Sequence, residues 1–225
     1  MTAGDVSKAR LDALQDSEQL KASLCHQQLL LTEVQHRMRN MLAVVRSIVR
    51  RTAETSESVE DFVNHLDGRI GAISRVQLAV TRDPLIGFDL AELIYEELRS
   101  CAAHEGEQFM LDGPPVRLKP KAAESIGLAI HELATNAVKY GAFTVSGGWI
   151  DIRWMTALRA DQTWLTIDWK ESGMQGRPVE ERRRGFGTVL LQQTLQYDLD
   201  AEVKRMFEPT GLHCEIAFPL ARHRA

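Results

Sequence analysis

The chain has 225 residues, with 27 basic and 31 acidic side chains and a formal net charge of -4. This length allows one sizeable core and a smaller helical module, so we expect two units. The near balance of charge offers no basic footprint for nucleic acid or for an acidic membrane, and the expected partners are therefore proteins or small molecules.

The spacing of the cysteines favours a reducing compartment, and the hydropathy of the chain favours a protein without a membrane span. Cys25, Cys101 and Cys214 are odd in number, widely spaced and far from any His or Cys at metal-ligand spacing. No apolar run approaches the roughly 20 residues that span a bilayer, and the N-terminus lacks the apolar core of a signal peptide. The sequence therefore predicts a cytoplasmic protein without a membrane span.

The first predicted element is a long helix from about residue 6 to residue 51. Its apolar residues recur by threes and fours, which is the spacing of a bundle seam, and they are Leu31, Val34, Met38, Met41, Leu42, Val45, Ile48 and Val49. After a polar turn with Ser56 or Ser58 as the candidate N-cap, a second helix begins near Val59. Such a hairpin cannot cover its own apolar stripe, so we predict a four-helix-bundle dimer.

A linker with Pro84 and Gly87 is predicted to lead into a second unit of mixed elements. Helices are expected near 90–103 and 120–140, and strands in the runs GWIDIRWM, TWLTIDWK, EVKRMF and LHCEIAFP. The predicted fold class is α plus α/β. The predicted domains are an extension at 1–28, a helical hairpin at 29–81 and an α/β unit at 88–221.

On the first helix, His36 lies roughly 175° from the apolar seam, at about 100° per residue. We expect its side chain to face solvent beside Glu33 and Asn40, one turn away on either side. An exposed imidazole could await an external phosphate donor, although an isolated His on a charged helix face is usually solvated surface. The motifs that follow favour the first reading.

The run AAESIGLAIHELATNAVKYGAF places Glu132, Asn136, Lys139 and Tyr140 on one helical stretch that ends at Gly141. A carboxylate and an amide spaced i, i+4 share a helix face and offer oxygen ligands to the Mg²⁺ that accompanies ATP phosphates. Lys139 is then a candidate phosphate contact. The alternative is an amphipathic core helix with solvated polar residues.

Two further motifs follow in the sequence. In IDWKESG, Trp169 and Glu171 stand at the end of a predicted strand, and Gly173 begins a loop. In RRRGFGTVLL, Gly185 and Gly187 precede a predicted helix whose N-terminus could meet phosphate through its free N–H groups. Either motif alone is weak evidence, because such turns are common.

Together these residues resemble the HWE family of histidine kinases, from about residue 29 to residue 220. His36, Arg37, Arg39 and Asn40 fill the family's phosphoacceptor pattern, although the family more often has Lys where Arg39 stands. The resemblance implies a Bergerat-type ATP-binding sandwich. Its expected catalytic residues are His36, Asn40 and Glu132, and its expected metal ligands are Asn136 and Glu132.

The resemblance also implies the nucleotide contacts, which are Asn136, Lys139, Tyr140, Glu171, Gly173, Gly185 and Gly187. Glu171 would accept a hydrogen bond from the adenine amino group. The segment MQGRPVEERRR would form the ATP lid, with Met174 and Gln175 departing from the family's Gly and Pro. His131 has two open readings, as the family's signature His near the nucleotide or as a structural His.

The implied function is that of a two-component histidine kinase, with ATP and Mg²⁺ as cofactors. It would phosphorylate itself on His36 and pass the phosphoryl group to an aspartate of a response regulator receiver domain. The expected partners are a second copy of the chain and a separate sensory protein. Two rival functions are an ATP-independent phosphotransfer protein and a non-catalytic scaffold that binds a response regulator. Residues 1–28 could be a signal-transmitting helix, the remnant of a truncation, or the start of a stand-alone kinase.

Overall fold

The structure is a computed structural model that describes residues 24, 27–29, 31, 32, 34, 35, 38, 39, 41–50, 52–54, 56, 58–82, 87–174 and 194–224. Packing divides the chain into a unit of Met1–Arg50 and a unit of Arg51–Ala225. In the first unit, residues 41–50 are helical, as the sequence predicts. Of the five predicted seam residues there, Met41, Leu42 and Val49 are exposed in the single chain, at 40%, 64% and 37%, whereas Val45 is half-buried and Ile48 is buried at 3%.

The second unit begins with α2 (Val59–Arg82). Of the two candidate caps, Ser58 caps this helix, since its Oγ accepts a hydrogen bond from the Asp61 N–H at 3.1 Å. Glu60 and Asp61 in the first turn complement the positive end of the helix dipole. Packing places α2 in the same unit as the sheet, whereas the sequence analysis placed it with the first helix; the predicted domain boundaries stay a prediction.

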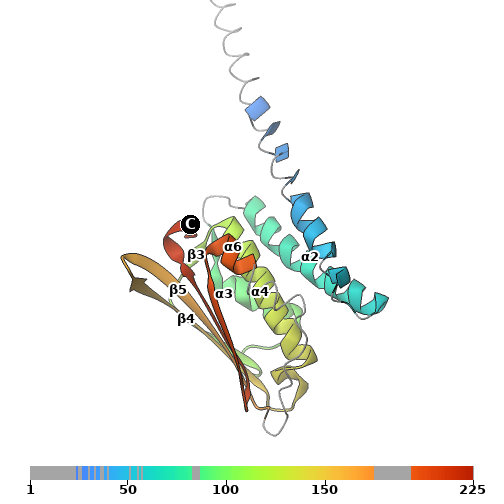
Figure 1. Cartoon of the computed structure of the whole chain (residues 1–225), viewed down its shortest axis with the longest axis vertical. Coiled ribbons are helices and arrows are strands. Elements are labelled where there is room, and N and C mark those ends of the chain that lie inside the picture. The colour runs from blue at the N-terminus through green and yellow to red at the C-terminus, as the bar shows by residue number, and fades with distance from the viewer. Residues whose placement is uncertain are drawn as a thin grey trace, which may run out of the picture. The chain divides into compact units, whose positions relative to one another are not determined.

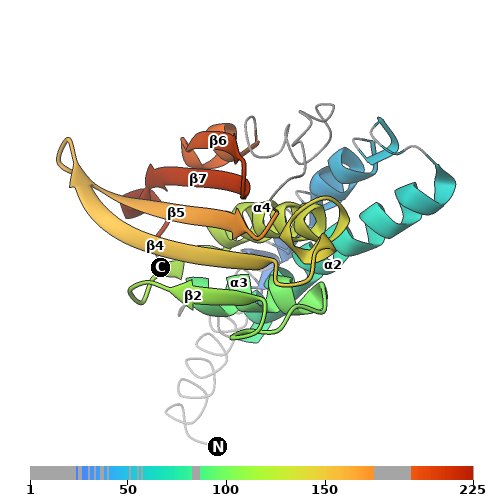
Figure 2. The ribbon, with the colours of Figure 1, turned by 90° about the horizontal axis from the view of Figure 1, so that it is seen from below.

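A five-stranded sheet forms the body of the second unit, in the order β2-β4-β5-β7-β6 (Figure 2). β2 (Phe109–Asp112) runs parallel to β4 (Trp149–Arg159). β5 (Gln162–Ser172), β7 (Gly211–Pro219) and β6 (Glu202–Glu208) continue it antiparallel. The four predicted strands are confirmed, while β2 and the short pair β1 (Phe88–Asp89) and β3 (Arg117–Leu118) were not predicted.

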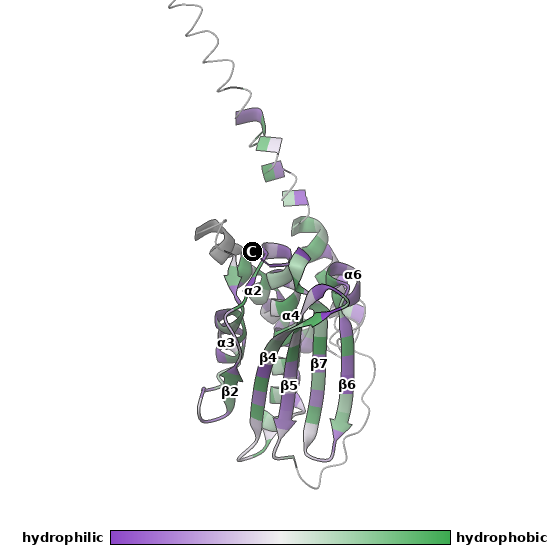
Figure 3. Cartoon of the chain, turned by 90° about the vertical axis from the view of Figure 1, so that its left-hand side faces the viewer, coloured by the Kyte–Doolittle hydropathy of each residue, from purple (hydrophilic) through white to green (hydrophobic). Residues whose placement is uncertain are grey.

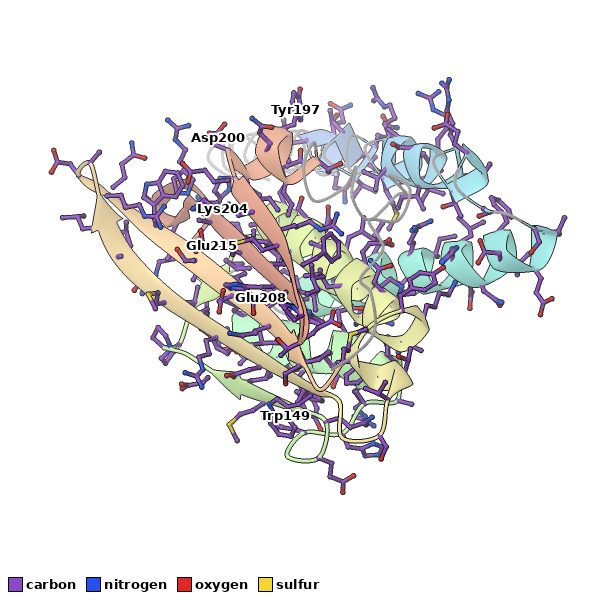
Figure 4. The ribbon with its side chains drawn as sticks, turned by 60° about the horizontal axis from the view of Figure 1, so that its bottom comes forward. Trp149, Tyr197, Asp200, Lys204, Glu208 and Glu215 are labelled. Carbon is purple, nitrogen blue, oxygen red and sulfur yellow. The ribbon has the colours of Figure 1, made fainter. Side chains whose placement is uncertain are left out.

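Polar and apolar residues alternate along the strands, so the sheet has one polar face (Figure 3). On that face Lys204 and Glu215 pair across β6 and β7 at 2.9 Å (Figure 4). The opposite face packs on α3 (Leu90–Ser100), α4 (Pro120–Lys139) and the short α6 (Leu195–Leu199). The core residues from α4 and β5 include Ile126, Ile130, Leu133, Leu165, Ile167 and Trp169, all at most 1% exposed.

The resulting order of layers is sheet, then α3 and α4, then α2 against the outer side of α4 (Figure 1). Helix α4 is therefore enclosed from two sides, which is why most of its side chains are buried. Within the described ranges, no helix combines the length and the hydropathy that crossing a membrane requires.

Candidate functional site

Helix α4 carries three of the predicted site residues over two turns, and a fourth, Tyr140, follows as its C-cap. Pro120 at the first helical position lacks the N–H that would be unsatisfied there, which suits the start of this helix. Asn136 is half-buried, and its side chain has no hydrogen bond with any described residue. Tyr140 is 49% exposed.

The Glu132 carboxylate is occupied by a guanidinium group from α2. Arg69 donates from Nε to Oε1 at 2.7 Å and from Nη2 to Oε2 at 3.0 Å, and its Nη1 donates to the Thr52 hydroxyl at 2.8 Å. Both charged side chains are buried, at 3% and 7% exposed. A fork-to-fork pair of this kind holds its partners in one geometry.

Lys139 is also held by α2. Its Nζ donates to Oδ1 of Asp61 at 3.1 Å and lies 2.7 Å from Nε2 of His65. Burial lowers the pKa of His65, and the Lys139 ammonium lowers it further, against Asp61, which raises it; the lowered pKa favours the neutral imidazole, whose Nε2 can accept this bond. The predicted phosphate contact is thus bound to two side chains of α2.

Glu171, at the end of β5, is a buried carboxylate that only neutral groups contact. It is 2% exposed, and it accepts hydrogen bonds from the Ala142 N–H at 2.9 Å and from the Trp169 indole at 3.2 Å. Burial raises the pKa of Glu171, against these two bonds, which lower it. Each carboxylate oxygen retains a lone pair that can accept a further N–H donor.

Glycines bring the end of α4 against the end of β5. A Cβ on Gly141 would lie 2.1 Å from Oε2 of Glu171, so only glycine permits this approach. Gly173 has a φ of +92°, and a Cβ there would lie 2.9 Å from the Gly147 oxygen. The structure therefore joins the two predicted motifs that contain Glu171 and Asn136.

His131 lies in a contact between helices. Its Nδ1 lies 3.2 Å from Oε2 of Glu97 on α3, and a Cβ on Gly68 of α2 would lie 2.6 Å from its Nε2. Of the two readings of this residue, the contacts favour the structural one. Trp169 is 1% exposed and orients Glu171 through its indole N–H.

Four of the predicted site residues, His36, Asn40, Gly185 and Gly187, lie outside the described residues. Conversely, sequence reasoning missed the α2 side chains that bind the predicted site, which are Asp61, His65 and Arg69. For Arg69 the sequence does contain a signal, which is its spacing. It precedes the buried residues Ala72, Ile73 and Val76 at intervals that place all four on one face of α2.

The described residues fit a metal ion in part. Mg²⁺ takes oxygen ligands and keeps several of its waters, and the Asn136 amide offers one oxygen. Both oxygens of Glu132 are engaged by Arg69, so Glu132 does not fit a metal ion in this arrangement. Across the described part of the chain, no three His, Cys, Asp or Glu residues cluster as a metal site.

Residues 33–115 match the model of the HWE histidine kinase family. Over 198 residues the chain is 30% identical to blue-light-activated histidine kinase 1 of Erythrobacter litoralis, covering 84% of this chain and 52% of that one. It is 28% identical over 216 residues to a blue-light-activated histidine kinase of Brucella anthropi, covering 95% and 43%. The chain thus spans about half the length of the curated relatives it matches.

The solved structures agree on the fold. A blue-light activated histidine kinase of Erythrobacter litoralis superimposes with a TM-score of 0.60 at 21% identity, covering 85% of this chain and 59% of that one. The histidine kinase domain of the same protein gives a TM-score of 0.50 at 15% identity, covering 80% and 95%. The predicted combination of a helical part and an α/β sandwich is therefore confirmed.

Proposed function

Because residues 33–115 of this chain belong to the HWE histidine kinase family, we propose that the chain is the kinase core of a two-component system. A nitrogen of His36 attacks the γ-phosphorus of ATP, a P–N bond forms, and ADP leaves with the electrons of the broken P–O bond. The phosphoryl group then passes to an aspartate of a response regulator receiver domain.

The observation that carries the nucleotide part of the proposal is the environment of Glu171. Burying a carboxylate that is 2% exposed and contacts only neutral donors costs folding stability, and such a cost favours a functional role for the residue. An adenine amino group is a neutral donor that this carboxylate could bind. Gly141 and Gly173 allow the backbone to come close on either side. We assign Tyr140 to the rim of this site, and Gly185 and Gly187 to the phosphates.

Asn136 is the protein ligand that we assign to Mg²⁺, with Glu132 joining it once Arg69 is displaced. When bound, Mg²⁺ would neutralise charge on the phosphates, which is the main requirement of phosphoryl transfer. Lys139 would add a second positive charge. Asn40, one turn from His36, would orient the acceptor imidazole.

The remaining parts of the proposal concern partners. The exposed seam of the first helix, with Val34 52% and Met38 57% exposed, favours pairing with a second copy of the chain. A signal would come from a separate sensory protein or from a further part of a longer chain. The need for ATP and for a response regulator places the reaction in the cytoplasm.

The test is incubation with Mg²⁺ and ATP labelled on its γ-phosphate. The protein should acquire an acid-labile, base-stable label, and Asn136→Ala should abolish the labelling while circular dichroism stays that of the wild type. If the protein binds nucleotide but acquires no label, the result contradicts the proposal that it is a kinase. A protein that accepts label only from a phosphorylated receiver would be a phosphotransfer protein, and one that binds a receiver without either reaction would be a scaffold.

A further inference from the structure

Helix α2 presents a buried stripe to α4 that contains a charge. Ala72, Ile73 and Val76 are at most 7% exposed, and Arg69, one turn before them, is 3% exposed. A guanidinium group is almost never buried without a partner, and the principal partner of Arg69 is Glu132. The contact between α2 and α4 is therefore built around a carboxylate of the proposed nucleotide site.

Contacts from α2 reach both ends of the proposed site on α4. Arg69 engages both oxygens of Glu132, at 2.7 and 3.0 Å. Two turns before Arg69 on α2, Asp61 lies 3.1 Å from the Lys139 ammonium, and one turn before Arg69, His65 lies 2.7 Å from it. Glu132 and Lys139, which lie on either side of Asn136 along α4, are thus both paired with side chains of α2. Glu132 binds the Arg69 guanidinium, and Lys139 binds the Asp61 carboxylate and the His65 imidazole.

A second set of contacts fixes the distance between the helices. Because Gly68 has no side chain, α2 comes close enough to α4 for the His131 ring to occupy the space in which a Cβ of residue 68 would lie. Nδ1 of the same ring lies within hydrogen-bond distance of Glu97. Arg75 of α2 donates two further hydrogen bonds to the same Glu97, which is fully buried. Helix α2 is thus docked by specific ion pairs as well as by apolar packing.

We propose that α2 is a latch on the nucleotide site, in which Arg69 competes with the nucleotide-bound metal ion for Glu132. The inference rests on the proposed function. The guanidinium group that holds both oxygens of Glu132 is positively charged and repels a metal ion at the same carboxylate, so docking of α2 and binding of Mg²⁺-nucleotide oppose one another. Linkage then requires that each weakens the other by the same factor.

Two variants test the latch by different routes. Arg69→Gln removes the competing charge, whereas Gly68→Ala keeps both charges and forces the His131 ring to move, because its Cβ would lie 2.6 Å from Nε2. Arg153→Gln is the matched control, since Arg153 pairs with Asp151 on β4, away from α2. Circular dichroism and thermal unfolding establish that each variant keeps the fold of the sheet unit.

The measurement is the dissociation constant of ADP, by calorimetry, in Mg²⁺ and in EDTA. We expect both latch variants to bind Mg²⁺-ADP at least tenfold more tightly than the wild type and the control, with a smaller change in EDTA. Equal or weaker binding of Mg²⁺-ADP by both variants, while the wild type binds it, would overturn the latch and leave the proposed function standing. Failure of every form to bind nucleotide would instead overturn the proposed function and the latch with it.

Hydrogen exchange gives an independent readout without any substitution. In the wild type, Mg²⁺-ADP should speed exchange of the amides in α2 while it slows exchange near Glu171. Slower exchange in α2 on addition of Mg²⁺-ADP would mean that the nucleotide strengthens docking, which contradicts the latch.

Discussion

Gly141→Ala tests whether the end of α4 is held against Glu171 as described. The new Cβ would lie 2.1 Å from Oε2 of Glu171 and 2.7 Å from the Ala137 Cα, where ordinary contacts begin near 3.4 Å. The carboxylate would have to move by more than an ångström, which breaks its 2.9 Å hydrogen bond from the Ala142 N–H. Loss of a hydrogen bond to a charged group costs about 1.5–3 kcal/mol, and overpacking costs about 1–3 kcal/mol.

We therefore expect Gly141→Ala to lower the free energy of unfolding by roughly 3–5 kcal/mol, measured by urea denaturation. Gly106→Ala is the control, because its Cβ would meet nothing within 4 Å and only its φ of +78° opposes a side chain. Its cost should stay near 1–2 kcal/mol. Equal costs for the two variants would refute the close contact between Gly141 and Glu171.

Three further predictions concern separate parts of the chain. Because burial raises the pKa of Glu171 above its ordinary 4.5, the folded protein keeps this proton to higher pH than the unfolded chain does, so its contribution to stability declines as pH rises above 4.5. The unfolding free energy of the wild type relative to Glu171→Gln should fall over that range, and a rise would contradict it. The β4–β5 turn has Ala160 and Asp161 at φ of 45° and 64°, so the Ala160→Asn, Asp161→Gly double variant should raise the unfolding free energy by about 1 kcal/mol, and a loss of stability would show that the turn is not of this type. Val45→Glu should weaken the proposed dimer roughly hundredfold, since an unpaired buried charge costs about 3 kcal/mol, and light scattering that finds the wild type already monomeric would exclude that dimer.

Local patterns in the sequence predicted much of the fold. The alternation in TWLTIDWK places Leu165, Ile167 and Trp169 on the buried face of β5, because side chains along a strand point to opposite faces in turn. The cap at Ser58 and the proline at the start of α4 likewise act within one turn of the chain. These elements were predicted because their causes lie within a few residues.

Elements stabilised from a distance were missed. The four residues of β2 pair in parallel with β4, some forty positions later, so nothing in FMLD alone marks a strand. The five-residue helix α6 is too short for a periodic signal and is held by the burial of Leu195 and Leu199.

The same distinction applies to the candidate site. Glu171 and Gly173 were predicted as a pair, but the need for glycine at Gly141 depends on a carboxylate thirty positions away. Arg69 was passed over because a single charge in a helix usually faces water, and only the fold reveals that its partner, Glu132, lies on another helix.

Localisation of the phosphoryl group within the chain tests the central claim most directly. Trypsin cleaves after Lys21 and Arg37, and the resulting peptide 22–37 contains both His26 and His36. After incubation with Mg²⁺-ATP and digestion at alkaline pH, mass spectrometry should find this peptide heavier by one phosphoryl group, with the added mass on its C-terminal two-residue fragment, which contains His36 alone. A phosphoryl group on His26, or on any peptide other than this one, would contradict the account.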